Sequence, residues 1–272
     1  MAVEGYSNQL AILLAALCSQ TYAHFDNPKG DIIIPQGYEW VSEFSARSFA
    51  GIRERFGFIL QSNDFIVVAF RGTSSMTDWI SDAIASQIKY KYVKGAGQSH
   101  RGITTIYDSA RRSIMETLRK LSSSKVLLIT GHSLGGALAT LCALDVAVNT
   151  DFQPPIVYSY GAPRVGDLDF ARCYGVLVDQ TYRIYNRFDV VPTLPPHVYK
   201  PPRSDTSFHY LHVRQGVELQ FNKGSISTNH VISSYFHALV LFDPAYTINL
   251  EQTSPGISPE VERDTVQPQP AN

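Results

Sequence analysis

The stretch Gly131-His132-Ser133-Leu134-Gly135 decides the interpretation of this sequence because of the residues on either side of it. Residues 125–130 (KVLLIT) have the length and the branched side chains of a buried strand. Residues 137–148 (ALATLCALDVAV) have the composition of a buried helix. Strand, Gly-x-Ser-x-Gly and helix in this order predict a nucleophile elbow, in which Ser133 stands on a sharp turn.

The glycines of this pentapeptide fit the same interpretation. Side chains at Gly131 and Gly135 would collide with the adjoining strand and helix, and Gly136 extends the patch of small residues. The hydroxyl of Ser133 would then point into the open, with the N-terminus of the following helix behind it. Unpaired N–H groups and partial positive charge at that end suit a site where an oxyanion forms. The alternative is a glycine-rich turn whose serine only caps the helix.

A serine hydroxyl needs a base to take its proton. Proteins with this elbow carry the acid and then the histidine after the serine, which leaves His197, His209, His212, His230 and His237. His230 is preferred because it ends a polar loop, residues 222–229, and opens a helix, so it can reach the elbow from a sheet end. His237, two helical turns later, is the main rival and is expected to pack instead.

The acid must hold the histidine in the right tautomer, which requires a carboxylate just past a strand. Asp189 directly follows the strand-like residues 181–186 and precedes Val190-Val191-Pro192, where the strand pattern stops. An aspartate that only caps its own turn is the alternative at this position. The other candidates for the acid are Asp167 and Asp169 after another strand, Asp145 inside the elbow helix, and Asp205 in a proline-rich loop.

Hydrophobic spacing and turn residues predict the remaining elements. Strands are expected at 56–61 and 65–71 around a turn at 62–64, at 156–160, at 181–186, and at 210–221 as a hairpin around 215–216. Helices are expected at 7–22, 104–121 and 231–242. The basic residues of the second helix are expected on its solvated face: Arg111, Arg112, Arg119 and Lys120.

Length and composition favour one large α/β domain. The chain has 272 residues, 44% of them hydrophobic, and a net charge of -1 that gives no reason to expect nucleic acid. Three cysteines (Cys18, Cys142, Cys173) allow at most one disulfide and look like small core residues rather than metal ligands. Beyond Pro244 the chain turns polar and proline-rich. We therefore predict a domain over 1–245 and a disordered tail over 246–272.

The apolar run at residues 10–18 (LAILLAALC) could be mistaken for the core of a signal peptide. The segment before it contains Glu4 and neither lysine nor arginine, so the basic region of a signal peptide is missing. The run is also too short to span a bilayer as a helix. We expect a first helix here and a protein that is cytoplasmic or exported by an atypical route.

Several ordered motifs together resemble the class 3 lipases, the filamentous-fungal type of triacylglycerol lipase with plant and bacterial relatives. The resemblance runs from about residue 57 to residue 241. The matching motifs are FRGT at 70–73, DW at 78–79, HRG at 100–102, GHSLGGALATL at 131–141, YGAPRVG at 160–166, NRFDVVP at 186–192 with LPP at 194–196, YLHV at 210–213 and HVISSYFH at 230–237.

This resemblance implies an α/β-hydrolase fold, with a central, mostly parallel sheet flanked by helices and a short helical lid. It implies a catalytic triad of Ser133, Asp189 and His230. The backbone N–H groups of Thr73 and Leu134 would form the oxyanion hole. No cofactor and no metal are implied. The structural disulfides of the family are not reproduced in this sequence, which puts stabilisation by disulfide bonds outside the cell in doubt.

The implied substrate is a lipid ester at an oil–water interface, with transient contact to lipid and no transmembrane segment. Alternatives within the enzymes are an esterase on non-lipid esters, such as aryl or feruloyl esters, and a phospholipase or galactolipase. The alternative outside the enzymes is a non-catalytic binding protein of the same fold. All three triad candidates are present, which disfavours that alternative.

The lid implied by the resemblance falls in residues 74–88 (SSMTDWISDAIASQI). Apolar residues at near-helical spacing form one face of this segment: Met76, Trp79, Ile80, Ile84 and Ile88. Such a helix can cover the cleft in water and turn its apolar face to lipid at an interface. The alternative is an ordinary surface helix whose apolar stripe packs on the core.

Replacing Trp79 and Ile80 by serine should separate these two interpretations. Each large side chain contributes about 1.5–3 kcal/mol when buried, so losing both should weaken adsorption to lipid. We expect hydrolysis of emulsified long-chain triacylglycerol to fall much more than hydrolysis of soluble short-chain esters. Circular dichroism checks folding, and an unchanged ratio of the two activities in a folded variant would assign these residues to an ordinary core.

Overall fold

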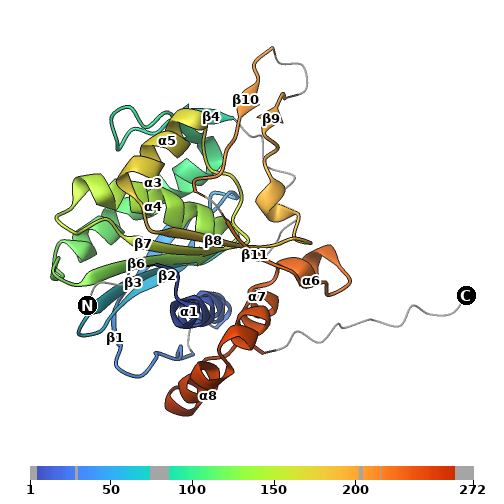
Figure 1. Ribbon diagram of the computed structural model, residues 1–272. Helices are drawn as coiled ribbons and strands as arrows, with labels where there is room; N and C mark the ends of the chain where they lie inside the picture. The colour runs from blue at the N-terminus through green and yellow to red at the C-terminus, as the bar shows by residue number, and fades with distance from the viewer. Residues whose placement is uncertain (1–4, 28–29, 74–85, 202–204, 215, 261–272) are drawn as a thin grey trace, which may run out of the picture.

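A seven-stranded sheet with the order β1-β2-β3-β6-β7-β8-β11 runs through the middle of the protein (Figure 1). The computed structural model describes residues 5–27, 30–73, 86–201, 205–214 and 216–260. Within this sheet, the pairing is parallel from β3 through β6, β7 and β8 to β11. Strand β1 pairs antiparallel with β2, and β2 pairs antiparallel with β3. The strands are β1 (Glu39–Arg47), β2 (Arg53–Gln61), β3 (Phe65–Phe70), β6 (Val126–His132), β7 (Ile156–Tyr160), β8 (Thr181–Asn186) and β11 (Gly216–Leu219).

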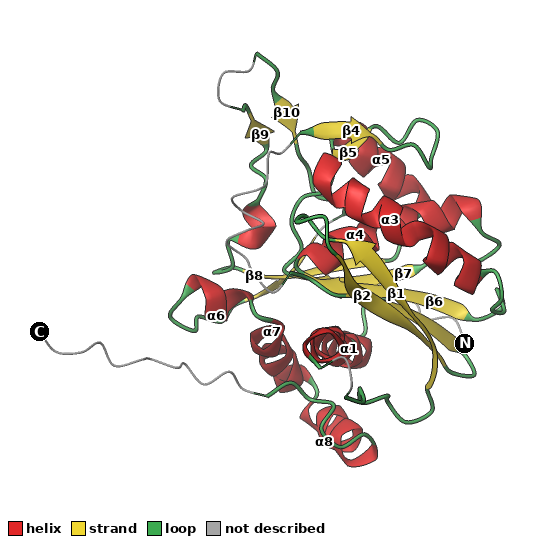
Figure 2. Ribbon diagram, turned by 180° about the vertical axis from the view of Figure 1, so that it is seen from behind, coloured by secondary structure: helices red, strands yellow, loops and turns green. Residues whose placement is uncertain are grey.

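Helices cover both faces of this sheet, as the two opposite views show (Figures 1 and 2). One face carries α3 (Arg101–Leu118), α4 (Leu134–Asn149) and α5 (Leu168–Leu177). The other face carries α1 (Asn8–Asp26) and α7 (Ile232–Leu239), with α8 (Pro244–Thr253) beyond them. The predicted α/β-hydrolase architecture, a mostly parallel sheet flanked by helices, is confirmed.

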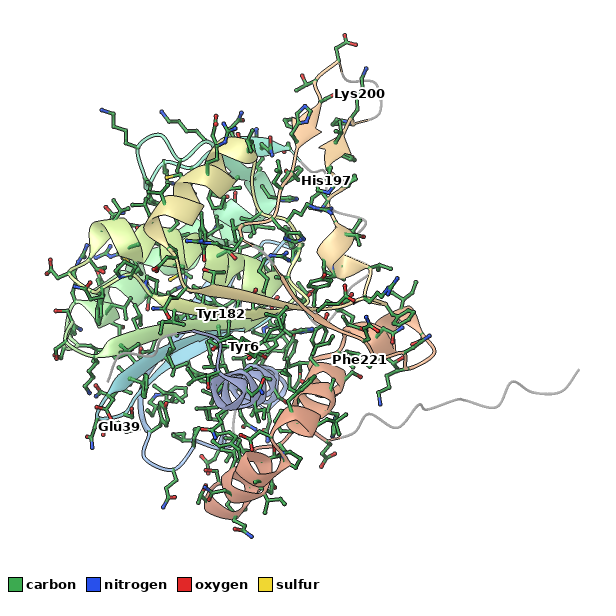
Figure 3. All side chains as sticks on the ribbon, viewed as in Figure 1. Tyr6, Glu39, Tyr182, His197, Lys200 and Phe221 are labelled. Carbon is green, nitrogen blue, oxygen red and sulfur yellow. The ribbon has the colours of Figure 1, made fainter. Side chains whose placement is uncertain are left out.

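Short elements connect or extend these layers. They are α6 (Ile226–His230), the 3₁₀ turns η1 (Val191–Thr193) and η2 (Val240–Phe242), and two small ribbons, β4 (Gln87–Lys89) with β5 (Gln98–His100) and β9 (Val198–Tyr199) with β10 (Phe208–His209). The second ribbon stands away from the main sheet, and Figure 3 labels Lys200 at its outer end. Within the described residues, no helix combines the length and the apolar character that a bilayer crossing needs.

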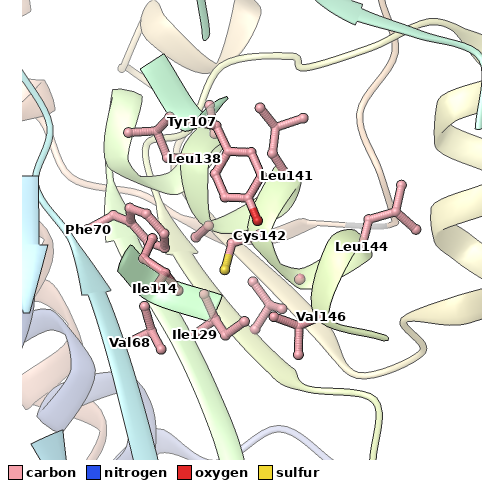
Figure 4. Close-up of a cluster of buried hydrophobic side chains, with 14 of the residues drawn as sticks. Val68, Phe70, Tyr107, Ile114, Ile129, Leu138, Leu141, Cys142, Leu144 and Val146 are labelled. Atoms are coloured by element: carbon pink, nitrogen blue, oxygen red, sulfur yellow. The ribbon is translucent and has the colours of Figure 1, made fainter. Parts of the chain in front are cut away.

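Strand alternation divides the core into two clusters. On β3, Ile66, Val68 and Phe70 belong to the cluster under α3 and α4, part of which Figure 4 shows, whereas Val67 and Ala69 belong to the cluster under α1. Because helices cover both faces, the strand is apolar at every position instead of at every second one. The predicted strands at 56–61, 65–71, 125–130, 156–160 and 181–186 are confirmed.

Helix α1 lies against the sheet as the predicted buried helix. It begins after Ser7, whose hydroxyl accepts a hydrogen bond from the Leu10 N–H at 3.3 Å. Residues 11–18 are all buried, and they contribute to the cluster on this face. The helix runs to Asp26, four residues beyond the predicted end at Tyr22.

The hairpin predicted over 210–221 is wrong. Residues 216–219 form β11, which pairs in parallel with β8, and Gly216 lies opposite Arg183. Leu211 instead forms an isolated bridge with Gly166. The open edge of β8 has backbone N–H and C=O groups without partners, and residues 216–219 form hydrogen bonds with them instead of folding back on residues 210–214. Periodicity within 210–221 carries no information about that distant edge.

The predicted domain boundary at residue 245 is also wrong for residues 246–260. Asp243 caps α8 by accepting from the Tyr246 N–H at 3.0 Å, and Pro244 occupies the first turn. Leu250 and Ile257 are buried in the cluster around α1, so a few well-placed apolar residues suffice to fix this segment. Residues 261–272 lie outside the described residues.

Arg111 does not lie on a solvated face as predicted. Its Nε and Nη2 donate to the two oxygens of Asp145 at 2.5 and 2.9 Å, and the Tyr107 hydroxyl donates to the same carboxylate at 2.7 Å. Asp145 is fully buried between α3 and α4. Arg112 does lie on the exposed face, where it pairs with Glu116. Asp145 is therefore engaged in a structural ion pair, which disfavours it as the acid of the site.

Asp145→Ala should destabilise the fold strongly, because it leaves the guanidinium of Arg111 and the Tyr107 hydroxyl without their buried acceptor. We expect a loss of about 3 kcal/mol in the free energy of unfolding, measured in urea. Glu116→Ala, which breaks the exposed pair with Arg112, serves as the matched control and should leave stability nearly unchanged. Equal effects of the two substitutions would contradict this account of the ion pair.

Candidate active site

The predicted elbow forms at the junction of β6 and α4. Ser133 lies between the last residue of β6 and the first residue of α4, with φ 57° and ψ -127°. A residue with a side chain avoids this backbone region unless its surroundings enforce it. A Cβ atom at Gly131 would lie 2.2 Å from the carbonyl carbon of Gly135, and one at Gly135 would lie 2.4 Å from the Phe70 oxygen. The glycines are thus required by close backbone approach, as the sequence predicted.

Ser133, His230 and Asp189 form one continuous hydrogen-bonded row. His230 Nε2 lies 2.9 Å from Ser133 Oγ, and His230 Nδ1 lies 2.7 Å from Asp189 Oδ2. Their exposed fractions are 7, 5 and 3%, so the row is largely shielded from water. Because a carboxylate only accepts, Nδ1 donates to it and Nε2 faces the serine as an acceptor. This arrangement fits a Ser-His-Asp triad.

Local secondary structure positions the base His230 and the acid Asp189 beside Ser133. Helix α6 starts with a capping box of Ser225 and Thr228 and ends at His230. Residues 226–229, predicted as loop, are therefore helical, and His230 ends a helix instead of opening one. Asp189 follows β8, and its Oδ1 accepts from the Val191 N–H at 2.9 Å, which fixes the carboxylate.

Tyr235 is a functional residue that the sequence reasoning did not single out. Its hydroxyl donates to Asp189 Oδ2 at 2.7 Å, on the same oxygen that faces His230. Burial and the nearby charge of Asp189 raise the pKa of Tyr235 well above its ordinary value, so the hydroxyl keeps the proton that it donates. Phe221, labelled in Figure 3, packs edge-on against this ring with centroids 5.4 Å apart.

Asn186, at the end of β8, is a second residue without an assigned role in the sequence reasoning. Its backbone N–H donates to the Tyr235 hydroxyl at 3.0 Å, and its side-chain amide donates to the Asn229 carbonyl at 3.2 Å. It thereby links the strand that precedes the acid to the residue that precedes the base. The one signal for both residues was their presence in the motifs at 186–192 and 230–237.

The rival histidines are occupied elsewhere. His237 Nδ1 contacts the Ser233 carbonyl at 2.6 Å, as a packing residue on α7 would. His212 Nε2 contacts the Pro192 carbonyl at 2.7 Å, and burial lowers the pKa of His212 to about 3. His197 Nδ1 contacts the Tyr210 carbonyl at 3.1 Å, and His209 is exposed on β10. Within the described part of the chain, His230 is the one histidine whose ring contacts the Ser133 hydroxyl.

The rival carboxylates also lie apart from His230. Asp167 caps α5 by accepting from the Phe170 N–H at 2.8 Å. Asp169 is exposed in the first turn of that helix, and Asp205 is exposed as well. Among the described residues, no three His, Cys, Asp or Glu side chains are grouped as metal ligands would be.

The candidate oxyanion hole lies where two backbone segments meet at the elbow. Leu134 is the first residue of α4, so its N–H has no acceptor within the helix. On the facing segment, a Cβ atom at Gly72 would lie 3.1 Å from Ser133 Cβ, which places the neighbour of Thr73 against the nucleophile. The predicted lid residues Met76, Trp79, Ile80 and Ile84 lie outside the described residues, so the lid stays a prediction there. Ile88, predicted on the same helical face, instead lies on strand β4, so that end of the predicted lid helix is wrong.

A mostly parallel sheet covered on both faces, an elbow serine, and an acid and a histidine later in the chain define the α/β hydrolases. Within that class, the family model described as Lipase (class 3) matches residues 67–199. Over these residues, the chain is similar to the class 3 lipases.

Relatives of two kinds match the chain. The lipase of Rhizomucor miehei is 35% identical over 181 residues, which cover 64% of this chain and 46% of that protein. Phospholipase A1-IIgamma of Arabidopsis thaliana is 27% identical over 243 residues, which cover 78% of this chain and 57% of that protein. The chain thus spans about half the length of these curated relatives.

Solved lipase structures share the fold. The lipase of Rhizopus microsporus var. chinensis aligns with a TM-score of 0.62 at 25% identity, over 78% of this chain and 74% of that one. A deletion mutant of the Rhizomucor miehei lipase propeptide complex aligns with a TM-score of 0.66 at 24% identity, over 81% of this chain and 69% of that one.

Alanine substitution should distinguish the two histidines at the C-terminal end. We expect His230→Ala to lower kcat on a soluble ester at least about a thousandfold, because the serine then lacks its base. His237→Ala should mainly lower the melting temperature. A larger loss of kcat from His237→Ala than from His230→Ala would show that His237, and not His230, is the base.

Asp189→Asn should cost activity on a similar scale, because an amide favours the wrong imidazole tautomer. Asp167→Asn is the matched control, since asparagine also caps a helix and the position lies apart from His230. Initial rates on the same ester measure both variants, and comparable losses would reopen the identity of the acid.

Proposed function

We propose that this protein hydrolyses carboxylic esters of lipids, in the manner of a triacylglycerol lipase. The row of hydrogen bonds from Ser133 through His230 to Asp189 carries the proposal, because it is the arrangement that a serine needs in order to act as a nucleophile at neutral pH. The fungal lipases among the relatives support the class of substrate.

The geometry assigns each group a step. His230 Nε2 takes the proton from Ser133 Oγ as that oxygen bonds to the ester carbonyl carbon, and the carbonyl oxygen becomes an oxyanion. The N–H groups of Thr73 and Leu134 would bind the oxyanion. His230 then gives its proton to the departing alcohol. Water repeats the sequence on the acyl-enzyme and releases the acid, with Asp189 and the donating Tyr235 holding the imidazole in place.

Apolar residues beside the site support a lipid substrate. Phe188, which precedes the acid, is 47% exposed, and Ile226, in the same short helix as the base, is 57% exposed. Exposed apolar side chains that adjoin the acid and the base along the chain can contact the acyl chains of a lipid ester.

A phospholipase A1 activity is the second candidate. Its support is that phospholipase A1-IIgamma of Arabidopsis thaliana matches a larger part of this chain than the lipase of Rhizomucor miehei does, 78% against 64%. Both activities use the same triad on a carboxylic ester, so the substrate decides between them. Emulsified triacylglycerol and phosphatidylcholine vesicles, assayed side by side at equal ester concentration with analysis of the released products, measure the preference. We expect the triacylglycerol to be hydrolysed faster, and faster hydrolysis of the phospholipid would favour the second candidate.

Ser133→Ala tests the proposed chemistry itself. One hydroxyl contributes little to packing, so the variant should fold, whereas ester hydrolysis should fall at least about a thousandfold. Hydrolysis of p-nitrophenyl esters of several chain lengths, with circular dichroism as the folding control, measures both. Near-wild-type activity in the folded variant would refute the assignment, and so would a wild-type protein that hydrolyses none of these esters.

A further inference from the structure

The side chain of His132, the neighbour of the nucleophile, lies on the face of the sheet that helix α1 covers. On β6 it follows Thr130 by two residues, and the Thr130 hydroxyl contacts the Cys18 thiol of α1 at 3.4 Å. Side chains two residues apart on a strand share a face, so the imidazole of His132 also faces α1. It is 4% exposed, and the centroid of its ring lies 4.7 Å from that of His230.

Both nitrogens of His132 are engaged, and their partners fix the tautomer. Nε2 lies 2.6 Å from the backbone oxygen of His230, and Nδ1 lies 2.8 Å from the hydroxyl of Tyr22. A carbonyl oxygen only accepts, so Nε2 carries the proton and Nδ1 accepts from Tyr22. Burial, with a smaller effect of the His230 ring, lowers the pKa of His132 well below its ordinary value, which keeps the ring neutral as this pattern requires.

Tyr22 also packs against the backbone segment that leads to Thr73. A Cβ atom at Gly72 would lie 2.2 Å from the Tyr22 hydroxyl oxygen, so only glycine permits the approach. Burial raises the pKa of Tyr22, and the hydroxyl therefore remains a donor to His132.

We propose that Tyr22 and His132 are positioning residues, which hold the backbone of His230 in a directional row of hydrogen bonds. The row runs from the Tyr22 hydroxyl to His132 and from His132 to the His230 carbonyl. It rests on the proposed function, because positioning matters only where Ser133 reacts. It joins helix α1, the neighbour of the nucleophile, and the base.

The carbonyl of His230 needs this partner because of where it lies. Helix α6 ends at His230, and Val231 has the extended backbone φ -60° and ψ 145°, so the carbonyl is among the last of a five-residue helix. Such carbonyls have no acceptor role within their helix and require an outside donor. Asp189 orients the ring of His230 while His132 holds its backbone. Displacing a catalytic group by about 1 Å can cost about a hundredfold in rate.

Tyr22→Phe tests the first link. The phenyl ring preserves the packing but no longer donates to His132, so the imidazole loses the hydrogen bond that orients its Nε2–H toward the His230 carbonyl. We expect kcat on a soluble p-nitrophenyl ester to fall about tenfold with KM unchanged. Tyr160→Phe is the matched control, since that buried hydroxyl also makes a hydrogen bond at α1, donating to the Ala11 carbonyl, but lies outside the row.

His132→Asn and His132→Gln test the second link. The shorter amide can accept from Tyr22 at the position of Nδ1 but cannot reach His230, whereas the longer amide places a donor near the position of Nε2. We therefore expect His132→Gln to retain kcat about tenfold better than His132→Asn, again at unchanged KM. A purely structural role would lower the melting temperature of both without this rescue.

The rate at which a fluorophosphonate labels Ser133 supplies a readout that does not depend on the natural ester. We expect the same order, with wild type and Tyr160→Phe fastest and His132→Asn slowest. Equal labelling and equal kcat for Tyr22→Phe and Tyr160→Phe, or for the two His132 variants, would overturn the positioning role while leaving the proposed function intact. A wild type that neither labels nor hydrolyses esters would overturn the proposed function itself.

Discussion

The backbone turn at Ser133 is the constraint on which the rest of the structure depends. A serine with φ 57° is held there by close contacts on every side, from the elbow glycines to the end of β3. The buried strand before it and the buried helix after it fix the direction of the chain on both sides of the turn. Backbone strain of this kind costs about 1–3 kcal/mol and persists only where its surroundings impose it. Here it directs the hydroxyl of Ser133 toward the Nε2 atom of the base.

Around that turn, polar groups are buried in an ordered sequence of donors and acceptors. Asp189 accepts from His230, Tyr235 and the Val191 backbone, and each donor comes from a different segment. A buried carboxylate is costly unless its oxygens are satisfied, so these contacts both stabilise the charge and fix its position. Asn186 ties the end of β8 to the same group of residues. The site is therefore held by the fold on both faces of the sheet, with α7 on one side and α4 on the other.

The sequence predicted the elements whose signals are local. The strand and the helix around Ser133 could be predicted because their composition and the glycines between them lie within 24 residues, 125–148. His230 and Asp189 could be ranked because each follows a recognisable loop or strand.

What could not be predicted depends on partners far along the chain. β11 joins the distant edge of β8, Arg111 finds Asp145, and Tyr22 meets His132 across 110 residues. Neither periodicity nor turn chemistry reports such contacts. The segment beyond residue 245 was misjudged because a few apolar residues in a polar stretch suffice to anchor a capped helix.

A crystal structure of the protein after reaction with a p-nitrophenyl alkylphosphonate would test the central claim most directly. The phosphonyl group stands in for the tetrahedral intermediate, with its oxygen at the place of the oxyanion. The account predicts phosphorus bonded to Ser133 Oγ, His230 still paired with Asp189, and the phosphonyl oxygen within hydrogen-bond distance of the N–H groups of Thr73 and Leu134. A phosphonyl group bound at another residue, or an oxygen that points away from both N–H groups, would contradict it.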